Sequence, residues 1–319
     1  MNTYQELFAR NYGIFSQTEQ ERLRRACILI VGCGGIGGTV AVMLARSGVG
    51  RFILVEFDDY SPSNMNRQVA CFTDTLGQNK ASVLSREIKR INPEAEVEVH
   101  AKHLPHAEIA ALIPKADIVF PAADDMAFSI MVFRDCRRLG KPALFVVPSG
   151  TWANVSIIMP NGPDVEAING VPRLPTYEAL KDVFRIRRYK FGTFFYVPLA
   201  DWRIEYYREF IEHDQPPTQL CPVVWLCSSL GAMEVLKVLS GKWKPVAAPR
   251  YWCIYRDRIR IQRINGPSLQ TLLVWQRRIM YRIFQTPLGV IQSLFQWLWW
   301  PWFNRHHKRR QEKAEGAWT

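Results

Sequence analysis

The sequence predicts an α/β protein built on a mostly parallel sheet, with helices on both faces and an antiparallel extension. From residue 27 to about residue 147, short apolar runs alternate with amphipathic helical patterns, which is the rhythm of βαβ units. Residues 151–159 then read as an antiparallel strand. With 319 residues and 48% hydrophobic content, the chain can bury a full core without disulfides or a structural metal.

The first predicted strand, residues 27–31, ends in a glycine-rich run at 32–38 and leads into an apolar helical pattern at 39–46. Glycine suits positions that need a positive φ or the close approach of a phosphate to the backbone. The helix that follows offers free N–H groups and the positive end of its dipole. We therefore expect a nucleotide phosphate to bind at this turn.

A glycine turn followed by an acidic residue does not distinguish an NAD-binding site from an ATP-binding site. The second predicted strand, residues 51–57, carries Glu56 near its end, and a ribose-binding acid suits an NAD enzyme as well as an ATP enzyme. The runs SNMNRQ and GQNK that follow supply Arg67 and Lys80. Adenylation needs such cations because pyrophosphate must leave with its charge neutralised, whereas hydride transfer does not.

Together these motifs resemble those of the ThiF/MoeB/HesA adenylyltransferases, bacterial relatives of ubiquitin-activating enzymes. The shared signature is a G-x-G-G-x-G loop, an acid closing the second strand, S-N-x-x-R-Q, G-x-x-K and an Asp after the fourth strand. The resemblance covers roughly residues 10–260 and implies a Rossmann-like, doubly wound fold. Two departures stand out: the ribose acid is usually Asp rather than Glu56, and Pro121 occupies a position where many members carry a further Asp.

The resemblance implies that ATP and Mg²⁺ are used to activate the C-terminal carboxylate of a ubiquitin-like or sulfur-carrier protein as an acyl-adenylate. By analogy Gly35 lies against the nucleotide, Glu56 holds the ribose, and Asp124 binds the metal; Asn64, Arg67 and Lys80 hold the phosphates. The full set of expected cofactor-binding residues is Gly32, Gly34, Gly35, Gly37, Glu56, Asp58, Asn64, Arg67, Gln68, Lys80, Asp124 and Asp125.

Asp124 and Asp125 also fit a second interpretation. They precede the helix predicted at residues 126–139, so they suit a capping pair at its N-terminus. We favour a ligand role because ligands of open parallel sheets gather at the carboxyl ends of strands, and Asp124 follows such an end.

Two further catalytic candidates come from the resemblance. In relatives an arginine of the N-terminal arm reaches a nucleotide in the partner subunit, and Arg10 is the best match; a solvated surface arginine is the alternative. Relatives that pass their substrate to a thiol often keep a cysteine before the helix predicted at 223–239. Cys221 precedes this helix and Cys227 lies within it, and these two are the candidates nearby. The alternative is a small buried hydrophobe, which is how Cys227 reads.

We divide the chain into an arm at 1–25, an adenylation domain at 26–265 and a tail at 266–319. Within the domain, residues 164–218 form a variable crossover segment rich in basic and aromatic residues. Such interleaving can bind nucleic acid. We favour a groove for the tail of a protein substrate, because relatives use this region in that way and no RNA-binding motif accompanies it. Residues 251–261 read as a last strand.

The tail has no charged residue between Arg282 and Arg305, and prolines and glutamines interrupt this apolar run. A spanning helix needs about 20 apolar residues. We therefore predict a helical, interfacial tail that contacts a membrane through residues 283–310, with its basic end against anionic lipid. The alternative is a helix docked on its own domain or in a dimer contact.

The remaining expectations concern compartment, metal and assembly. The cysteines form no C-x-x-C pair, so we expect no structural zinc. The polar first ten residues do not read as a secretory signal, and we expect a cytoplasmic protein whose tail reaches the inner face of the membrane.

Relatives usually form homodimers, and we expect one here. Two rival functions remain open: a tRNA-modifying dehydratase of the same superfamily, and a non-catalytic nucleotide-binding scaffold.

Overall fold

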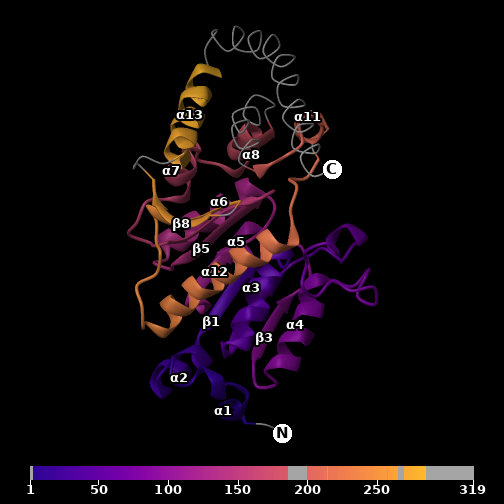
Figure 1. Ribbon diagram of the computed structural model, residues 1–319, viewed down its shortest axis with the longest axis vertical. Coiled ribbons are helices and arrows are strands. Elements are labelled where there is room, and N and C mark those ends of the chain that lie inside the picture. The colour runs from indigo at the N-terminus through magenta and orange to yellow at the C-terminus, as the bar shows by residue number, and fades with distance from the viewer. Residues whose placement is uncertain (1–2, 186–199, 214, 257, 265–268, 285–319) are drawn as a thin grey trace, which may run out of the picture.

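One eight-stranded sheet organises the protein (Figure 1). The computed structural model describes residues 3–185, 200–213, 215–256, 258–264 and 269–284. The strand order is β3-β2-β1-β4-β5-β6-β7-β8. The strands are β1 (Cys27–Val31), β2 (Arg51–Val55), β3 (Glu96–His100), β4 (Ile118–Pro121), β5 (Ala143–Ser149), β6 (Trp152–Ile158), β7 (Arg250–Tyr255) and β8 (Arg258–Arg263).

The sheet is parallel from β3 to β5 and antiparallel from β5 to β8, as the sequence predicts. β1 lies inside the parallel part, where Ile28 pairs with Phe52 on one side and Ile118 on the other. All five residues of β1 are buried, which explains its uninterrupted apolar sequence. This confirms the fold class.

Helices cover both faces of the sheet, as the alternation of strand residues requires. Ile28 and Ile30 belong to a core shared with α3, α4 and α12, whereas Leu29 and Val31 belong to a second core shared with α5 to α8. The α-helices are α1 (Tyr4–Leu7), α2 (Gln17–Arg25), α3 (Gly35–Arg46), α4 (Lys80–Ile91), α5 (His106–Leu112), α6 (Met126–Arg138), α7 (Val165–Asn169), α8 (Tyr177–Arg185), α11 (Ile204–Glu212), α12 (Cys221–Ser240) and α13 (Leu269–Phe284). Short 3-10 turns occur at Ala9–Asn11, Pro62–Asn64 and Ile113–Lys115.

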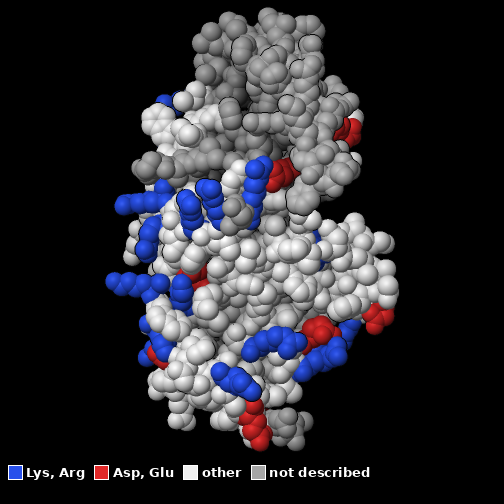
Figure 2. Space-filling model, viewed as in Figure 1, with Lys and Arg blue, Asp and Glu red and all other residues white. Residues whose placement is uncertain are grey.

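α12 is the longest of the described helices, and it ends where Gly241 adopts a left-handed conformation. Among the described residues it is the one helix long and apolar enough to cross a membrane, but half of it is buried against α3, β5 and β6. Its outer side is apolar as well, with Trp225, Leu226 and Met233 exposed. Figure 2 shows a broad uncharged area over α12 and α3.

Two expectations need correction or restriction. The single strand predicted at 251–261 is wrong: β7 and β8 form a hairpin that reverses near Arg256, whose φ is +49°. The apolar alternation continues through the turn, which contains no glycine or proline. The sequence therefore gives no signal that the chain reverses direction here. Most of the membrane segment predicted at 283–310 lies outside the described residues, and that contact stays a prediction, as does the division into arm, domain and tail.

Candidate functional site

A cavity of about 270 Å³ opens at the carboxyl ends of β1, β2 and β4. Ligand sites of open parallel sheets lie at this edge because loops from several strands converge there. Ten of the twelve expected cofactor-binding residues line the cavity. They are Gly32, Gly34, Gly35, Glu56, Asp58, Arg67, Gln68, Lys80, Asp124 and Asp125.

The glycines of the first turn divide into two roles. Gly32 has φ +104°, and a Cβ there would lie 2.6 Å from the carbonyl carbon of Ala122 in the loop after β4. A Cβ at Gly37 would lie 1.9 Å from the Gly32 oxygen. Gly37 therefore serves close packing of α3 on the turn and does not line the cavity. Gly34 and Gly35 do line it, at the N-terminus of α3.

Glu56 is held in place by the backbone around it. The Cys33 N–H donates to Glu56 Oε2 at 3.0 Å, and the Asp58 N–H donates to Oε1 at 3.0 Å. The residue is 8% exposed, so these bonds fix a buried carboxylate between the glycine turn and the end of β2. Each carboxylate oxygen keeps lone-pair capacity for a further donor from a ligand. Burial also raises the pKa of the Cys33 thiol, which therefore stays neutral.

Two cations from separate elements converge on the cavity. Lys80 begins α4, and its Nζ pairs with Asp58 Oδ2 at 3.0 Å; the lysine side chain is 8% exposed and the aspartate 51%. Arg67 donates through Nη1 to the Ser63 oxygen at 3.0 Å and to Asn66 Oδ1 at 2.8 Å. Its Nε is buried and has no hydrogen-bond partner among the described residues.

Asp124 and Asp125 have different environments. Asp125 caps α6, since its Oδ1 accepts from the Phe128 N–H at 3.0 Å, and its Oδ2 accepts from the Tyr177 hydroxyl at 2.7 Å. That hydrogen bond is the main cause of a raised pKa at Tyr177. Asp124 is exposed on the cavity wall and accepts no hydrogen bond from the described residues. The capping interpretation therefore holds for Asp125 alone.

The cavity walls also include residues that the sequence interpretation missed. Lys102 and His103 come from the loop after β3, and the His103 ring lies 5.5 Å from that of Phe57 between centroids. These two could have been found, because they follow a strand end as Glu56 and Asp124 do. Tyr177 comes from α8 in the variable segment, and no motif marks it.

Besides Gly37, three expected site residues lie off the cavity wall. Asn64 is 8% exposed, and its Oδ1 accepts from the Ser61 N–H at 3.1 Å, so it closes a turn. Arg10 is exposed in the N-terminal arm. Cys221 is half-buried at the first position of α12; Gln219, two residues earlier, does line the cavity. Cys227 is fully buried, which raises its pKa to about 12 and confirms it as core.

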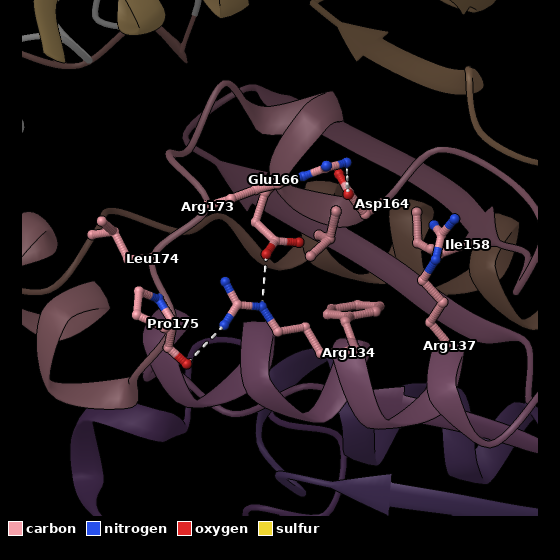
Figure 3. Close-up of a pocket in the computed structure, with 10 residues that line it drawn as sticks. Arg134, Arg137, Ile158, Asp164, Glu166, Arg173, Leu174 and Pro175 are labelled. Carbon is pink, nitrogen blue, oxygen red and sulfur yellow. Dashed lines mark hydrogen bonds and ion pairs between the residues drawn. The ribbon is translucent and has the colours of Figure 1, made fainter. Parts of the chain in front are cut away.

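A second cavity, of about 320 Å³, lies between α6, α7 and the segment before α8 (Figure 3). Arginines dominate its polar wall, but each is bonded to the protein. Arg134 Nε pairs with Glu166 Oε1 at 2.8 Å, Arg173 pairs with Asp164, and Arg137 donates to a backbone carbonyl at 2.7 Å. None of the expected site residues lines this cavity, so the first cavity is the candidate functional site.

The sequence model of the ThiF family matches residues 8–271, most of the chain. The protein belongs to the ThiF family. Among its relatives, the vegetative HesA protein of Trichormus variabilis is 33% identical over 146 residues, which is 46% of this chain and 55% of that protein. The sulfur carrier protein adenylyltransferase of Thermus thermophilus is 36% identical over 126 residues, 40% of this chain and 46% of that protein.

The fold likeness extends further than the sequence likeness. The crystal structure of E. coli MccB with ATP covers 82% of this ThiF-family chain and 68% of its own, with 25% identity and a TM-score of 0.58. Relatives also include a tRNA threonylcarbamoyladenosine dehydratase of Haemophilus influenzae. The chain spans about half the length of most of the curated relatives it matches.

Proposed function

We propose that this protein is an ATP-dependent adenylyltransferase that activates the C-terminal carboxylate of a ubiquitin-like or sulfur-carrier protein. The observation that carries the proposal is the cavity in which a glycine turn, a buried acid, two cations and a carboxylate without a partner among the described residues meet. A relative named for sulfur-carrier adenylation and a solved neighbour that holds ATP support the same chemistry.

Each group of the cavity has a role in this reaction. The N–H groups at Gly34 and Gly35 bind phosphate oxygens at the helix N-terminus, and Glu56 accepts a ribose hydroxyl. Lys80 exchanges part of its pairing with Asp58 for phosphate contact. Arg67 is the second phosphate cation, since turning its guanidinium toward the cavity gives its orphaned Nε an acceptor.

The substrate carboxylate needs no general base, because it is ionised near pH 7. Its oxygen attacks the α-phosphorus, and the bond from that phosphorus to the bridging oxygen of pyrophosphate breaks. Lys80 and Arg67 stabilise the charge that develops on the leaving group. Asp124 fits a Mg²⁺ ligand, because this ion takes one or two carboxylates and fills its remaining positions with water and phosphate oxygens. When bound, the ion neutralises phosphate charge.

The variable segment 164–218 is the proposed recognition element for the substrate tail. Its described part borders the nucleotide cavity through Tyr177, which bonds to Asp125 at the start of α6. If the C-terminal tail of the substrate protein binds along this segment, its terminal carboxylate would lie in the cavity beside the nucleotide. Passage of the acyl group to Cys221 is part of the proposal: the sulfur attacks the acyl carbon, the bond from that carbon to AMP breaks, AMP leaves, and the thiol proton passes to solvent. This half-buried cysteine starts the helix that packs on α3.

We also propose a homodimer, with the outer side of α12 in the contact. Trp225, Leu226 and Met233 are 41%, 37% and 48% exposed on this side. Patches of this kind on soluble proteins mark interaction surfaces. In such a dimer Arg10 is the candidate for contact with the partner's nucleotide.

The experiment for the adenylation proposal is ATP–pyrophosphate exchange with candidate carrier proteins and, separately, with tRNA. Carrier-dependent exchange that Asp124→Asn abolishes while the protein stays folded supports the proposal. Exchange that requires tRNA would favour the dehydratase alternative. Mg-ATP binding without exchange under either condition would favour a nucleotide-binding scaffold.

A further inference from the structure

Helix α13 (Leu269–Phe284) carries apolar side chains on two different sides. Val274 is 1% exposed and lies on the side that packs inward. Leu272, Trp275 and Ile279 are 66%, 60% and 47% exposed, and their spacing of three and four residues places them on one face. At 3.6 residues per turn, Val274 lies about 160° around the helix from Leu272, about 140° from Ile279 and about 100° from Trp275. The exposed apolar face is therefore additional to the face that docks the helix.

The helix is attached to the domain in a way that leaves this face outward. Arg278 Nη2 donates to the Ala167 oxygen of α7 at 2.9 Å. Figure 1 shows α13 rising from α7 at the end of the molecule away from α1 and α2. Three large apolar side chains in a row on an outward face indicate a partner surface.

The charges of α13, together with the sequence that follows it, indicate what the partner is. The sequence of α13 holds three arginines and no acidic residue, and Arg278 and Arg282 are exposed. The next 22 residues contain no charge and four tryptophans, and the run at 305–310 then holds four further Lys or Arg. Tryptophan favours the headgroup depth of a bilayer, and arginine pairs with lipid phosphate. A second copy of the chain would oppose the same arginines across a two-fold axis, which disfavours self-association through this face.

We propose that α13 lies flat on an anionic lipid surface. Leu272, Trp275 and Ile279 insert at the headgroup level, and Arg282 contacts lipid phosphates, with Arg278 at the margin of the same surface. This membrane contact is independent of the adenylation proposal, because it uses none of the residues of the nucleotide cavity.

The test is co-sedimentation of the full-length protein with phosphatidylcholine vesicles that contain or lack about one-third phosphatidylserine. We expect binding to the anionic vesicles only. The double variant Leu272→Glu/Trp275→Glu should have a partition coefficient lower by about tenfold or more, because it replaces the inserted groups with charges that anionic lipid repels. Arg282→Gln should lower the partition coefficient about fivefold, the expected effect of one basic residue at such a surface.

Ile14→Glu is the matched control, since Ile14 is 56% exposed on the N-terminal arm, and it should leave binding unchanged. Thermal unfolding of each variant at the wild-type temperature shows that the fold is intact. Wild-type protein that stays in solution with anionic vesicles overturns the proposal. So does a folded double variant that binds as wild type. If vesicle binding is unchanged and the double variant loses thermal stability, the face belongs to packing within the chain. If vesicle binding is unchanged and light scattering gives the double variant a smaller oligomer than wild type, the face contacts a second copy.

Discussion

Replacing Lys80 with alanine tests the phosphate-binding role, and its magnitude can be worked from the ion pair. The Lys80 side chain is 8% exposed and its partner Asp58 is 51% exposed. Without the lysine, Asp58 rehydrates, so the free energy of unfolding should change by at most about 1 kcal/mol. A preorganised charge contact in the transition state is worth about 2.7–4 kcal/mol, or 10²–10³ in rate. Because Lys80 must first loosen from Asp58, we expect the lower end, about a hundredfold.

The assay is ATP–pyrophosphate exchange with the carrier, supported by calorimetric titration of Mg-ATP without the carrier. The control is Lys89→Ala, an exposed lysine near the other end of the same helix, α4. It should exchange and bind as wild type, whereas Lys80→Ala should lose both nucleotide affinity and exchange. A folded Lys80→Ala protein with exchange close to the wild-type rate would refute the assignment of Lys80 to the phosphates.

Three further outcomes are expected. Cys221→Ala should retain exchange but lose any reducible adduct with the carrier, observed by non-reducing electrophoresis; an adduct that survives places the nucleophile elsewhere. Arg134→Ala leaves its buried partner Glu166 unpaired and should lower the free energy of unfolding by about 3–5 kcal/mol. Arg173→Ala removes a side chain that is 73% exposed and should lower the same free energy by about 1 kcal/mol or less. Equal effects in urea denaturation would contradict this difference. Met233→Glu should convert the proposed dimer to monomers by light scattering, and an unchanged mass would remove α12 from the contact.

Most of the fold could be predicted because its signals are local. Five consecutive apolar residues bounded by glycine leave little choice for β1, which must be buried on both faces. Ser16 with Glu19 reads as a capping box, and both of its hydrogen bonds are present at the start of α2. The β7–β8 hairpin could not be predicted in this way. Its reversal depends on a positive φ at Arg256, which no residue preference indicates.

The site was predictable to the extent that its residues follow strand ends. This rule located Glu56 and Asp124, and applied once more it would have reached Lys102 and His103 after β3. It could not reach Tyr177, because this residue enters the cavity from a helix whose position depends on tertiary packing. The rule also could not exclude Asn64 from the expected site residues. The motif around Asn64 is compatible with phosphate binding and equally with the turn that this residue closes.

Asp124 and Asp125 show why a motif identifies a site more readily than it assigns roles within it. The two carboxylates are adjacent and chemically identical, and both line the cavity. Asp125 accepts hydrogen bonds from one backbone N–H and one tyrosine hydroxyl, whereas Asp124 accepts none from the part of the chain that the structure describes. The tyrosine belongs to the variable segment, so Asp125 links that segment to the start of α6 beside the proposed nucleotide site. If a bound substrate tail moves α8, the hydrogen bond between Tyr177 and Asp125 changes first. The position of the neighbouring Asp124 then changes through the backbone that the two aspartates share.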